Sequence, residues 1–384
     1  MFKKINAPLS LQWEVVPFCN YNCVHCYNYW RSSYDSQGDG YWELESANRI
    51  VDEIIKSKIN AVTITGGEPL LIFEKIKPYI ERFLEHGLKV SLNTNGSYID
   101  DNIANYLGEK GIGILVSFPC SIAEINDKIT NCIGSFEATC SGIKTASKHG
   151  VNVHVNMVVS KINQNYVVET AKYVKEKLGL KRFNATKAGK PLNASSDFEK
   201  YEMGLQDLRK LIDDLVFIKN EMDMFVDSLN AYPQCAYVSR ESYEMLGARR
   251  NCSAGRTSAA IGYDGNLKSC VRAGNMYGNL LEDSLVDCWN RMSEWRDDSL
   301  LPVGCEKCNK RNKCAGACRV EAMVLFSSMN APDPCMDIEN IPVEFHVPGA
   351  KITEFDDIDQ FLLSVYWGKN PRLLGETFRS TCYG

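Results

Sequence analysis

Short apolar runs alternate with longer amphipathic runs along the first 220 residues. Six runs have the length and composition of buried strands, at residues 11–16, 61–65, 88–92, 112–118, 151–159 and 181–186. Between them, segments such as 73–87 and 135–150 place apolar residues three and four apart and end at glycine, as helices do. Six such units predict an α/β fold, a partial (β/α)6 TIM-like barrel whose ligand site lies at the C-terminal strand ends.

After about residue 235, glycine, asparagine and cysteine become frequent and the helical periodicity fades. Two short apolar runs flank Asp264-Gly265, which predicts a β-hairpin. A last periodic run at 357–369 predicts a closing helix. These changes predict four regions, namely a barrel (1–220), a helical connection (221–251), a small cysteine-rich domain (252–340) and a C-terminal helical extension (341–384).

The charge balance argues against nucleic acid as a partner. The 384 residues carry a formal net charge of −5, so no basic stripe is available to neutralise phosphates, although a local basic patch would not show in the total. No apolar run approaches the roughly 18 residues of a membrane span. The N-terminus also lacks the apolar core of a signal peptide. A soluble, cytoplasmic protein without a membrane partner is therefore expected.

Sixteen cysteines in such a chain require an explanation. Disulfides suit small secreted domains, whereas regularly spaced cysteines in a reduced compartment more often bind metal. Cys19, Cys23 and Cys26 follow the first predicted strand with the spacing C-x3-C-x2-C. Three thiolates hold three irons of a 4Fe–4S cube and leave the fourth iron open, as a catalytic metal site does. The alternative is a structural zinc ion with His25 or a distant residue as its fourth ligand.

This spacing, followed by the aromatic residue Tyr27, resembles the radical SAM superfamily, whose motif follows the first strand of a βα barrel. The resemblance implies that Cys19, Cys23 and Cys26 bind a 4Fe–4S cluster whose open iron is chelated by S-adenosylmethionine (SAM). It further implies that one electron cleaves SAM to a 5'-deoxyadenosyl radical, which takes a hydrogen atom from the substrate. A non-enzymatic electron carrier would have no use for such an open site.

Polar and glycine-rich residues follow the next strands, where a barrel places its ligands. The sequence TGGEP (65–69) follows the second strand, and its two glycines permit a close approach of the backbone. Each such feature, taken alone, is equally typical of ordinary strand ends. By the same resemblance, the cofactor contacts are expected at Tyr27, Gly66, Gly67, Glu68, Pro69, Asn95, Ser117 and Asn156.

The C-terminal cysteines follow a second pattern, C-x12-G-x4-C, then C-x2-C-x5-C-x3-C, then a last cysteine, with Gly265 as the glycine. This order resembles the SPASM domain, which binds two auxiliary 4Fe–4S clusters. The resemblance implies Cys252, Cys270 and Cys318 as ligands of the first cluster, and Cys305, Cys308, Cys314 and Cys335 as ligands of the second. Some relatives complete the first cluster with an upstream cysteine, for which Cys235 is the candidate. A zinc ribbon would explain only the middle four cysteines.

SPASM proteins mostly modify peptides or proteins. The resemblance therefore implies a maturase that abstracts a hydrogen atom from a ribosomally made peptide, followed by crosslinking, excision or another side-chain or backbone change. Its expected cofactors are SAM and three 4Fe–4S clusters, with a flavodoxin or ferredoxin as electron donor. Only eighteen residues precede Cys19, so the N-terminal peptide-binding domain of many crosslinking relatives is expected to be absent. Recognition would then require direct docking or a separate protein.

Two other activities stay open. One is a radical SAM dehydrogenase or epimerase that acts on a small molecule such as a sugar. The other is formylglycine formation on a sulfatase. Maturases of that kind place an aspartate directly after the hairpin cysteine, whereas this chain has Val271 and Arg272 after Cys270. This difference disfavours formylglycine formation.

The catalytic residues stay unassigned. An oxidative route needs a general base, because the radical product must lose a proton as well as an electron. Glu68, Asp127 and Asp264 lie near the motifs, but Asp264 is more typical of a turn. Cys120 follows the fourth strand, where the family often has an aspartate, and is either an idle buried thiol or a group at the active face. The aromatic-rich stretch 26–42 either shields the first cluster from water or forms a wall for a peptide side chain.

Overall fold

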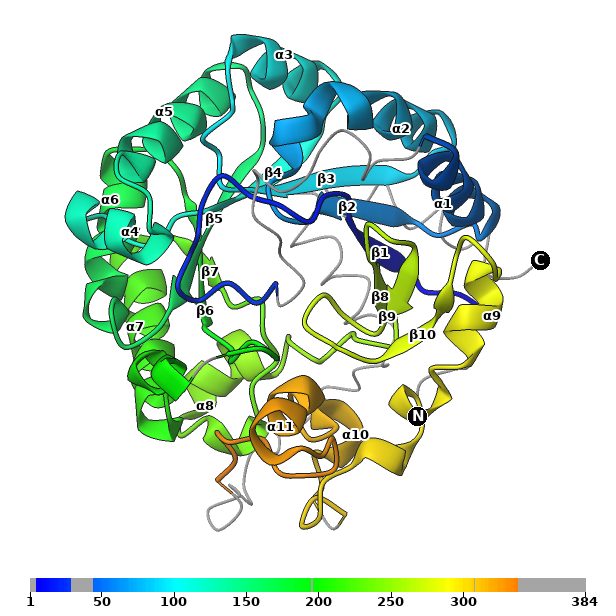
Figure 1. Ribbon diagram of the computed structural model, residues 1–384. Helices are drawn as coiled ribbons and strands as arrows, with labels where there is room; N and C mark the ends of the chain where they lie inside the picture. Colours follow the sequence, from blue (N-terminus) through cyan, green and yellow to red (C-terminus); the bar gives the residue numbers. More distant parts are fainter. Residues whose placement is uncertain (1–4, 29–43, 195, 307, 338–384) are drawn as a thin grey trace.

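The computed structural model describes residues 5–28, 44–194, 196–306 and 308–337. In this part of the chain, ten strands form one sheet in the order β10-β9-β8-β1-β2-β3-β4-β5-β6-β7. The first seven strands are β1 (Ser10–Glu14), β2 (Ala61–Thr65), β3 (Lys89–Thr94), β4 (Gly113–Ser117), β5 (Val153–Val159), β6 (Arg182–Lys187) and β7 (Phe225–Asp227). Figure 1 shows that the sheet is strongly curved and that helices cover its outer side.

Strands β1 to β7 are parallel, and each pairs with the next along the chain. The six strands predicted from the apolar runs are confirmed as β1 to β6, and the partial TIM-like barrel is confirmed with them. Strand β7 was not predicted, because its three residues directly follow a long helix and are too few to show an alternation.

The outer helices bury one face each against the strands. They are α1 (Leu44–Lys56), α2 (Phe73–Glu85), α3 (Asp101–Glu109), α4 (Ala123–Thr130), α5 (Ser135–Lys148), α6 (Val167–Glu176) and α7 (Leu205–Met222). In α2, the buried residues recur at three- and four-residue spacing, and Tyr79 and Phe83 pack edge-to-face on Trp13 of β1 with ring centroids 6.1 Å apart. These aromatic contacts hold the C-terminal end of β1, which precedes the first cysteine loop, against α2.

The cysteine-rich region continues the barrel sheet. Its strands are β8 (Ser258–Ile261), β9 (Asn266–Lys268) and β10 (Met276–Asn279), and β8 pairs in parallel with β1. The predicted hairpin is confirmed as β8–β9. At its turn, Gly265 adopts a φ of 82°, and Asp264 accepts a hydrogen bond from the backbone N–H of Asn266 at 3.1 Å. Asp264 therefore has the role of a turn residue.

Four shorter helices complete the described chain, namely α8 (Arg240–Ser242), α9 (Leu285–Asn290), α10 (Arg311–Cys314) and α11 (Arg319–Phe326). Helices α10 and α11 lie on the side of the ring between α8 and the β8–β10 strands (Figure 1). The helix predicted at 357–369 lies outside the described residues. Among the helices that are described, none is long and apolar enough to cross a membrane.

A buried ion pair connects the barrel to the hairpin. Lys268 Nζ of β9 lies 2.5 Å from Glu14 Oε2 of β1, and both side chains are almost completely buried. A buried charge is tolerated only with a close partner, because its transfer from water costs several kcal/mol. The pair therefore fixes the position of β9, and with it that of Cys270 two residues later.

We predict that Lys268→Met lowers the free energy of unfolding by about 3–5 kcal/mol, because it leaves the Glu14 carboxylate buried without its cation. The double variant Glu14→Leu/Lys268→Met is expected to recover most of this loss. Urea unfolding of the three proteins would provide the measurement. Equal stability of the single variant and the parent protein would contradict this role of the ion pair.

Candidate active site

A cavity of about 820 Å³ occupies the inside of the barrel, and its lining extends from the first residues of β1 and β4 to the C-terminal ends of the strands. Its size falls in the range of small-molecule and cofactor sites. Six thiols line it, from Cys19, Cys23, Cys26, Cys252, Cys270 and Cys318. The structure thus brings the N-terminal motif and the cysteines expected at the first auxiliary cluster to the walls of one cavity. The other cysteines of the C-terminal pattern do not line it.

The N-terminal cysteine loop rests on helix α4. The backbone N–H groups of Asn22 and Val24 donate to the carbonyls of Thr130 and Ile129, each at 2.9 Å. Within the loop, the backbone N–H of Tyr21 points at Cys19 Sγ from 3.4 Å. These contacts hold the loop in place while its three thiols face the cavity. Helix α4 itself was not predicted, although the loop depends on it.

The turn after β2 explains the two glycines of the TGGEP stretch. Gly67 N–H donates to the Val16 carbonyl at 2.7 Å, and Glu68 N–H donates to the Phe18 carbonyl at 2.9 Å. A Cβ atom on Gly67 would lie only 1.7 Å from the Phe18 carbonyl oxygen. The glycines therefore permit close contact with the backbone that immediately precedes Cys19, and both glycines also line the cavity, where cofactor contacts are expected.

Glu68 joins the ends of β2 and β3. Its carboxylate accepts hydrogen bonds from the backbone N–H of Leu70 at 3.0 Å, the Thr94 hydroxyl at 2.7 Å and the backbone N–H of Asn95 at 2.7 Å. Burial raises the pKa of Glu68 to about 7, against the opposing effect of these donors. The carboxyl group therefore titrates close to neutral pH. Pro69, which was also expected to contact the cofactor, begins the short 3-10 helix η3 (Pro69–Ile72) and does not line the cavity.

Asn95 extends this connection to the cysteine loop. Its side-chain amide donates to Asn20 Oδ1 at 2.8 Å and lies 3.8 Å from Cys19 Sγ. Its own oxygen accepts from the Ser97 hydroxyl at 2.6 Å. The Glu68–Asn95–Asn20 chain of contacts therefore orients the first thiol. Asn20 was not identified from sequence, because an asparagine beside a cysteine carries no distinctive pattern.

Three more expected cofactor contacts line the same cavity. Ser117 and Asn156 are register partners on β4 and β5, so they lie at one level of the barrel. The Thr186 hydroxyl donates to Asn156 Oδ1 at 2.9 Å and orients its amide. Tyr27 also lines the cavity, and burial, together with the nearby Glu14, raises the pKa of its phenol. Residues 29–42 of the predicted aromatic-rich stretch lie outside the described residues.

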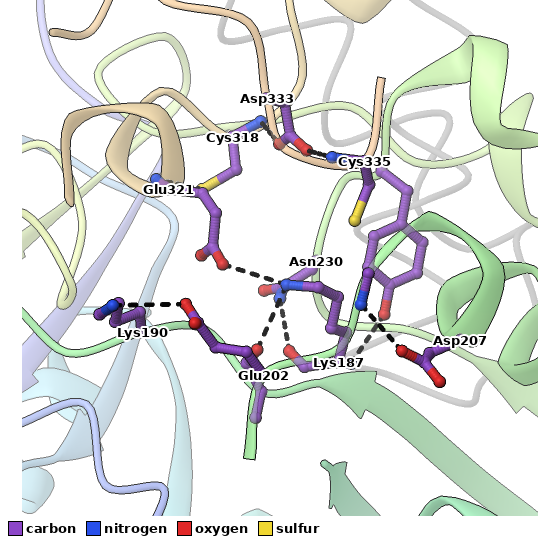
Figure 2. Close-up of polar contacts among 12 residues, drawn as sticks. Lys187, Lys190, Glu202, Asp207, Asn230, Cys318, Glu321, Asp333 and Cys335 are labelled. Atoms are coloured by element: carbon purple, nitrogen blue, oxygen red, sulfur yellow. Dashed lines mark hydrogen bonds and ion pairs between the residues drawn. The ribbon is translucent and has the colours of Figure 1, made fainter. Parts of the chain in front are cut away.

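Glu321 of α11 joins two cations beside the first auxiliary group of thiols. Its carboxylate lies 3.0 Å from Lys187 Nζ at the end of β6 and 2.5 Å from the Arg272 guanidinium. Burial would raise the pKa of Glu321, but Arg272 and Lys187 hold it at about 2. Arg272 also lies 3.8 Å from Cys318 Sγ. Figure 2 shows Glu321 between Cys318 and Lys187.

Asp333 connects the two expected auxiliary groups through the backbone. Its two carboxylate oxygens accept from the N–H groups of Cys318 at 3.1 Å and Cys335 at 2.9 Å (Figure 2). Cys318 lines the cavity, whereas Cys335 is buried away from it. One carboxylate thus fixes the distance between cysteines that are seventeen positions apart in the sequence.

Cys235 lies with the second auxiliary group. Burial raises its pKa to about 12, and Cys314 and Cys305 are the nearby thiols that contribute to this shift. The preceding residue, Gln234, donates its backbone N–H to the Cys314 sulfur. The backbone N–H of Asp337 points at Cys235 Sγ from 3.2 Å. The structure therefore places this thiol near Cys305 and Cys314, whereas the resemblance makes it a candidate for the first auxiliary cluster.

The remaining candidates have structural surroundings. Cys120 is completely buried and does not line the cavity. Asp127 accepts hydrogen bonds from Gly134, Ser135 and Phe136 and stabilises the start of α5. His25 lines the cavity, and burial lowers its pKa to about 4, so its imidazole is neutral at physiological pH. Of the carboxylate residues considered as a base, only Glu68 faces the cavity.

The donor sets fit iron–sulfur clusters. None of the described cysteines forms a disulfide. In the described ranges, no three His, Cys, Asp or Glu side chains converge on one point where a single ion would fit. A cluster binds its thiolates through different irons, so its ligands need not converge. Burial raises the pKa of Cys270 and Cys318, so cluster uptake at these thiols must release protons.

Comparisons with known proteins agree with this geometry. Residues 13–174 match the model of the radical SAM superfamily. The chain is 26% identical over 342 residues to the AdoMet-dependent heme synthase of Methanosarcina barkeri, which covers 84% of this chain and 94% of that protein. It is 24% identical over 359 residues to the mycofactocin maturase MftC of Mycobacterium tuberculosis, with 90% and 88% covered. The structure of native anSMEcpe with bound AdoMet and Cp18Cys peptide has the same fold, with a TM-score of 0.67, 19% identity and coverage of 97% and 99%.

We predict that Glu68 makes the stability of the metal-free protein fall as pH rises. Its pKa is about 7 in the folded chain against 4.5 when unfolded, so its contribution is complete below pH 4.5 and is lost as pH rises through 7. Glu68→Gln removes this titration. The free energy of unfolding of the parent, relative to the variant, should fall by about 2–3 kcal/mol between about pH 5 and pH 8. Parallel pH profiles of the two proteins in urea would contradict the assignment.

Proposed function

The chain is a radical SAM enzyme, with a domain of that superfamily over residues 13–174, and on this premise we propose that it modifies a ribosomally made peptide. The observation that carries the proposal is the single cavity shared by the thiols of the N-terminal motif and of Cys252, Cys270 and Cys318. A substrate that enters this cavity lies between a site of SAM cleavage and a second redox centre. That arrangement suits the removal of a hydrogen atom and a further electron from one substrate.

We assign Cys19, Cys23 and Cys26 as the ligands of the cluster that binds SAM. When bound there, the cluster supplies the electron that cleaves SAM and starts the radical reaction. The chain itself contributes position and shielding. Asn95 and Asn20 orient Cys19, while Glu68, Ser117 and Asn156 present polar groups to the cavity at the strand ends. These groups are suited to hold the charged amino acid part and the ribose of SAM.

We also propose two auxiliary 4Fe–4S clusters, one for each C-terminal group of thiols. The first would be held by Cys252, Cys270 and Cys318, with Arg272 beside the last thiol to balance negative charge. The second would be held by four of the five thiols of Cys305, Cys308, Cys314, Cys335 and Cys235, because a 4Fe–4S cluster has four ligand positions. The neighbourhood of Cys235 supports its inclusion in the second set. Such clusters supply an acceptor for the second electron, and a flavodoxin or ferredoxin is the proposed external donor.

The proposal that the substrate is a peptide is supported by the similar proteins. Mycofactocin maturase MftC is a maturase by name, and the fold neighbour anSMEcpe was solved with a peptide. A separate peptide-recognition protein remains part of the proposal. The AdoMet-dependent heme synthase of Methanosarcina barkeri, at 26% identity, favours a second candidate function, a radical SAM enzyme that acts on a small molecule.

Mass spectrometry of an anaerobic reaction would separate these functions. We predict that the reconstituted enzyme, with SAM, a reductant and the short peptide encoded beside its gene, changes the peptide mass and releases 5'-deoxyadenosine. Cys19→Ala should abolish both, with at least a hundredfold loss of rate, because the cluster loses one of three ligands. Cys132→Ala is the matched control, since this thiol does not line the cavity. Cleavage of SAM without any change in the peptide would favour the small-molecule function.

A second prediction concerns the role of Cys235. Cys235→Ser should weaken or abolish the electron paramagnetic resonance signal of one auxiliary cluster and lower the iron content from about twelve towards about eight atoms per chain, as expected for three clusters of the 4Fe–4S type. Cys288→Ser is the control, because Cys288 is also buried but packs beside Asp283 and Arg291. Unchanged iron content and spectra in Cys235→Ser would remove this residue from the ligand set.

A further inference from the structure

Three charged side chains, which we call the charged triad, connect the end of β6 to the first auxiliary group of thiols. Glu321 lies between Lys187 Nζ at 3.0 Å and Arg272 Nη2 at 2.5 Å. The side chains of Lys187 and Glu321 are 8% and 7% exposed, and that of Arg272 is 13% exposed. Hydrophobic residues of similar volume often stabilise a fold as well as buried ions do, so the charges themselves suggest a function.

Arg272 turns the positive end of the triad towards a thiol. Its Nη2 atom binds Glu321 and lies 3.4 Å from the Lys190 carbonyl oxygen, while its Nη1 atom points at Cys318 Sγ from 3.8 Å. A guanidinium group can hold a carboxylate with one arm and present the other arm to a second acceptor, in a fixed geometry that an ammonium group lacks. Arg272 and Cys318 both line the cavity.

Gly189 provides the space in which the guanidinium group lies. A Cβ atom at this position would lie 1.8 Å from Arg272 Nη2 and 2.0 Å from its Cζ atom. The guanidinium group therefore packs directly against the backbone of Gly189, two residues after the end of β6. Together with Glu321 and the Lys190 carbonyl, this contact fixes the position of the cation beside Cys318.

The sulfur of Cys318 faces N–H groups. Cys318 caps α11, and its Sγ atom accepts from the backbone N–H of Glu321 at 3.4 Å. Within the described chain, this N–H and Arg272 Nη1 are the two hydrogen-bond donors to that sulfur. The Asp333 carboxylate accepts the backbone N–H of Cys318 instead, at 3.1 Å. The triad and Asp333 together have no net charge, so the effect on the sulfur depends on which groups face it.

We infer that Arg272 is a positioning residue for electron uptake, because it raises the reduction potential of the 4Fe–4S cluster proposed at Cys252, Cys270 and Cys318. This inference rests on the proposed function, since it specifies a property of the same auxiliary site. One-electron reduction adds a negative charge, and a cation and N–H groups beside a ligating sulfur favour the more negative state. These thiols line the cavity, so a higher potential there favours uptake of an electron from a substrate radical.

A redox titration of the full-length, reconstituted enzyme, monitored by electron paramagnetic resonance, tests this inference. The signal of the first auxiliary cluster is assigned by its loss in Cys270→Ser. At the midpoint potential of the parent, we expect the ratio of reduced to oxidised cluster to fall about tenfold in Arg272→Gln, which corresponds to about 59 mV for one electron. Glu321→Gln should change the ratio in the opposite direction, because it removes the negative charge that offsets Arg272.

Gly189→Ala tests the position of the cation without a change of charge. The new methyl group would displace the end of a flexible side chain, so we expect the ratio to fall as it does in Arg272→Gln. Gly204→Ala is the control, because its Cβ atom would meet Asp207 at 4.0 Å, an ordinary contact. The iron content of each protein shows whether the cluster is retained. If Arg272→Gln loses its cluster, Gly189→Ala decides the outcome.

Lys190→Gln is the matched control for charge, because Lys190 pairs with Glu202 at 3.6 Å and does not line the cavity (Figure 2). Equal potentials of Arg272→Gln and Lys190→Gln would overturn the inference and leave the proposed function intact. Shifts of Arg272→Gln and Glu321→Gln in the same direction would also overturn it, since they would indicate a purely structural role. A parent enzyme that cleaves SAM but has no signal dependent on Cys270 would overturn both the inference and the proposed first auxiliary cluster.

Discussion

The buried carboxylate of Glu68 connects the parts of the first site. It accepts hydrogen bonds from the backbone after β2 and from the end of β3, and its own N–H donates to the carbonyl that precedes Cys19. This arrangement requires Gly67, since any Cβ there would collide with the Phe18 carbonyl. A buried polar network of this kind is stabilising only when its members are satisfied. The first cysteine loop, the glycine turn and Asn95 are therefore one structural unit.

The second constraint is the pairing of β8 with β1. It extends the barrel sheet into the cysteine-rich region, and the Glu14–Lys268 ion pair fixes the adjoining strand. Cys270 lies two residues after the end of that strand and lines the same cavity as Cys19. The sheet thus explains how thiols roughly 250 positions apart in the sequence come to face one substrate space. Two groups of thiols at a single cavity are the structural basis of the proposed oxidative chemistry.

Local patterns predicted the fold better than they predicted the site. Strands β1 to β6 and the hairpin at Asp264-Gly265 were evident, because their apolar runs and turn residues are local signals. The partnership of Glu321 with Lys187 and Arg272 was not, because it joins residues up to 134 positions apart and depends on tertiary packing. The proximity of Cys235 to Cys305 and Cys314 likewise depends on how the chain folds, and the spacing of the cysteines along the sequence does not reveal it.

The central claim is that a peptide inside this cavity loses a hydrogen atom to the radical derived from SAM. It is tested most directly by transfer of deuterium from a peptide labelled at non-exchangeable C–H positions into 5'-deoxyadenosine. The account predicts that 5'-deoxyadenosine gains deuterium in proportion to the modified peptide, and that Cys19→Ala gives neither product. Release of unlabelled 5'-deoxyadenosine from every labelled peptide, while a small molecule transfers its label, would contradict the account.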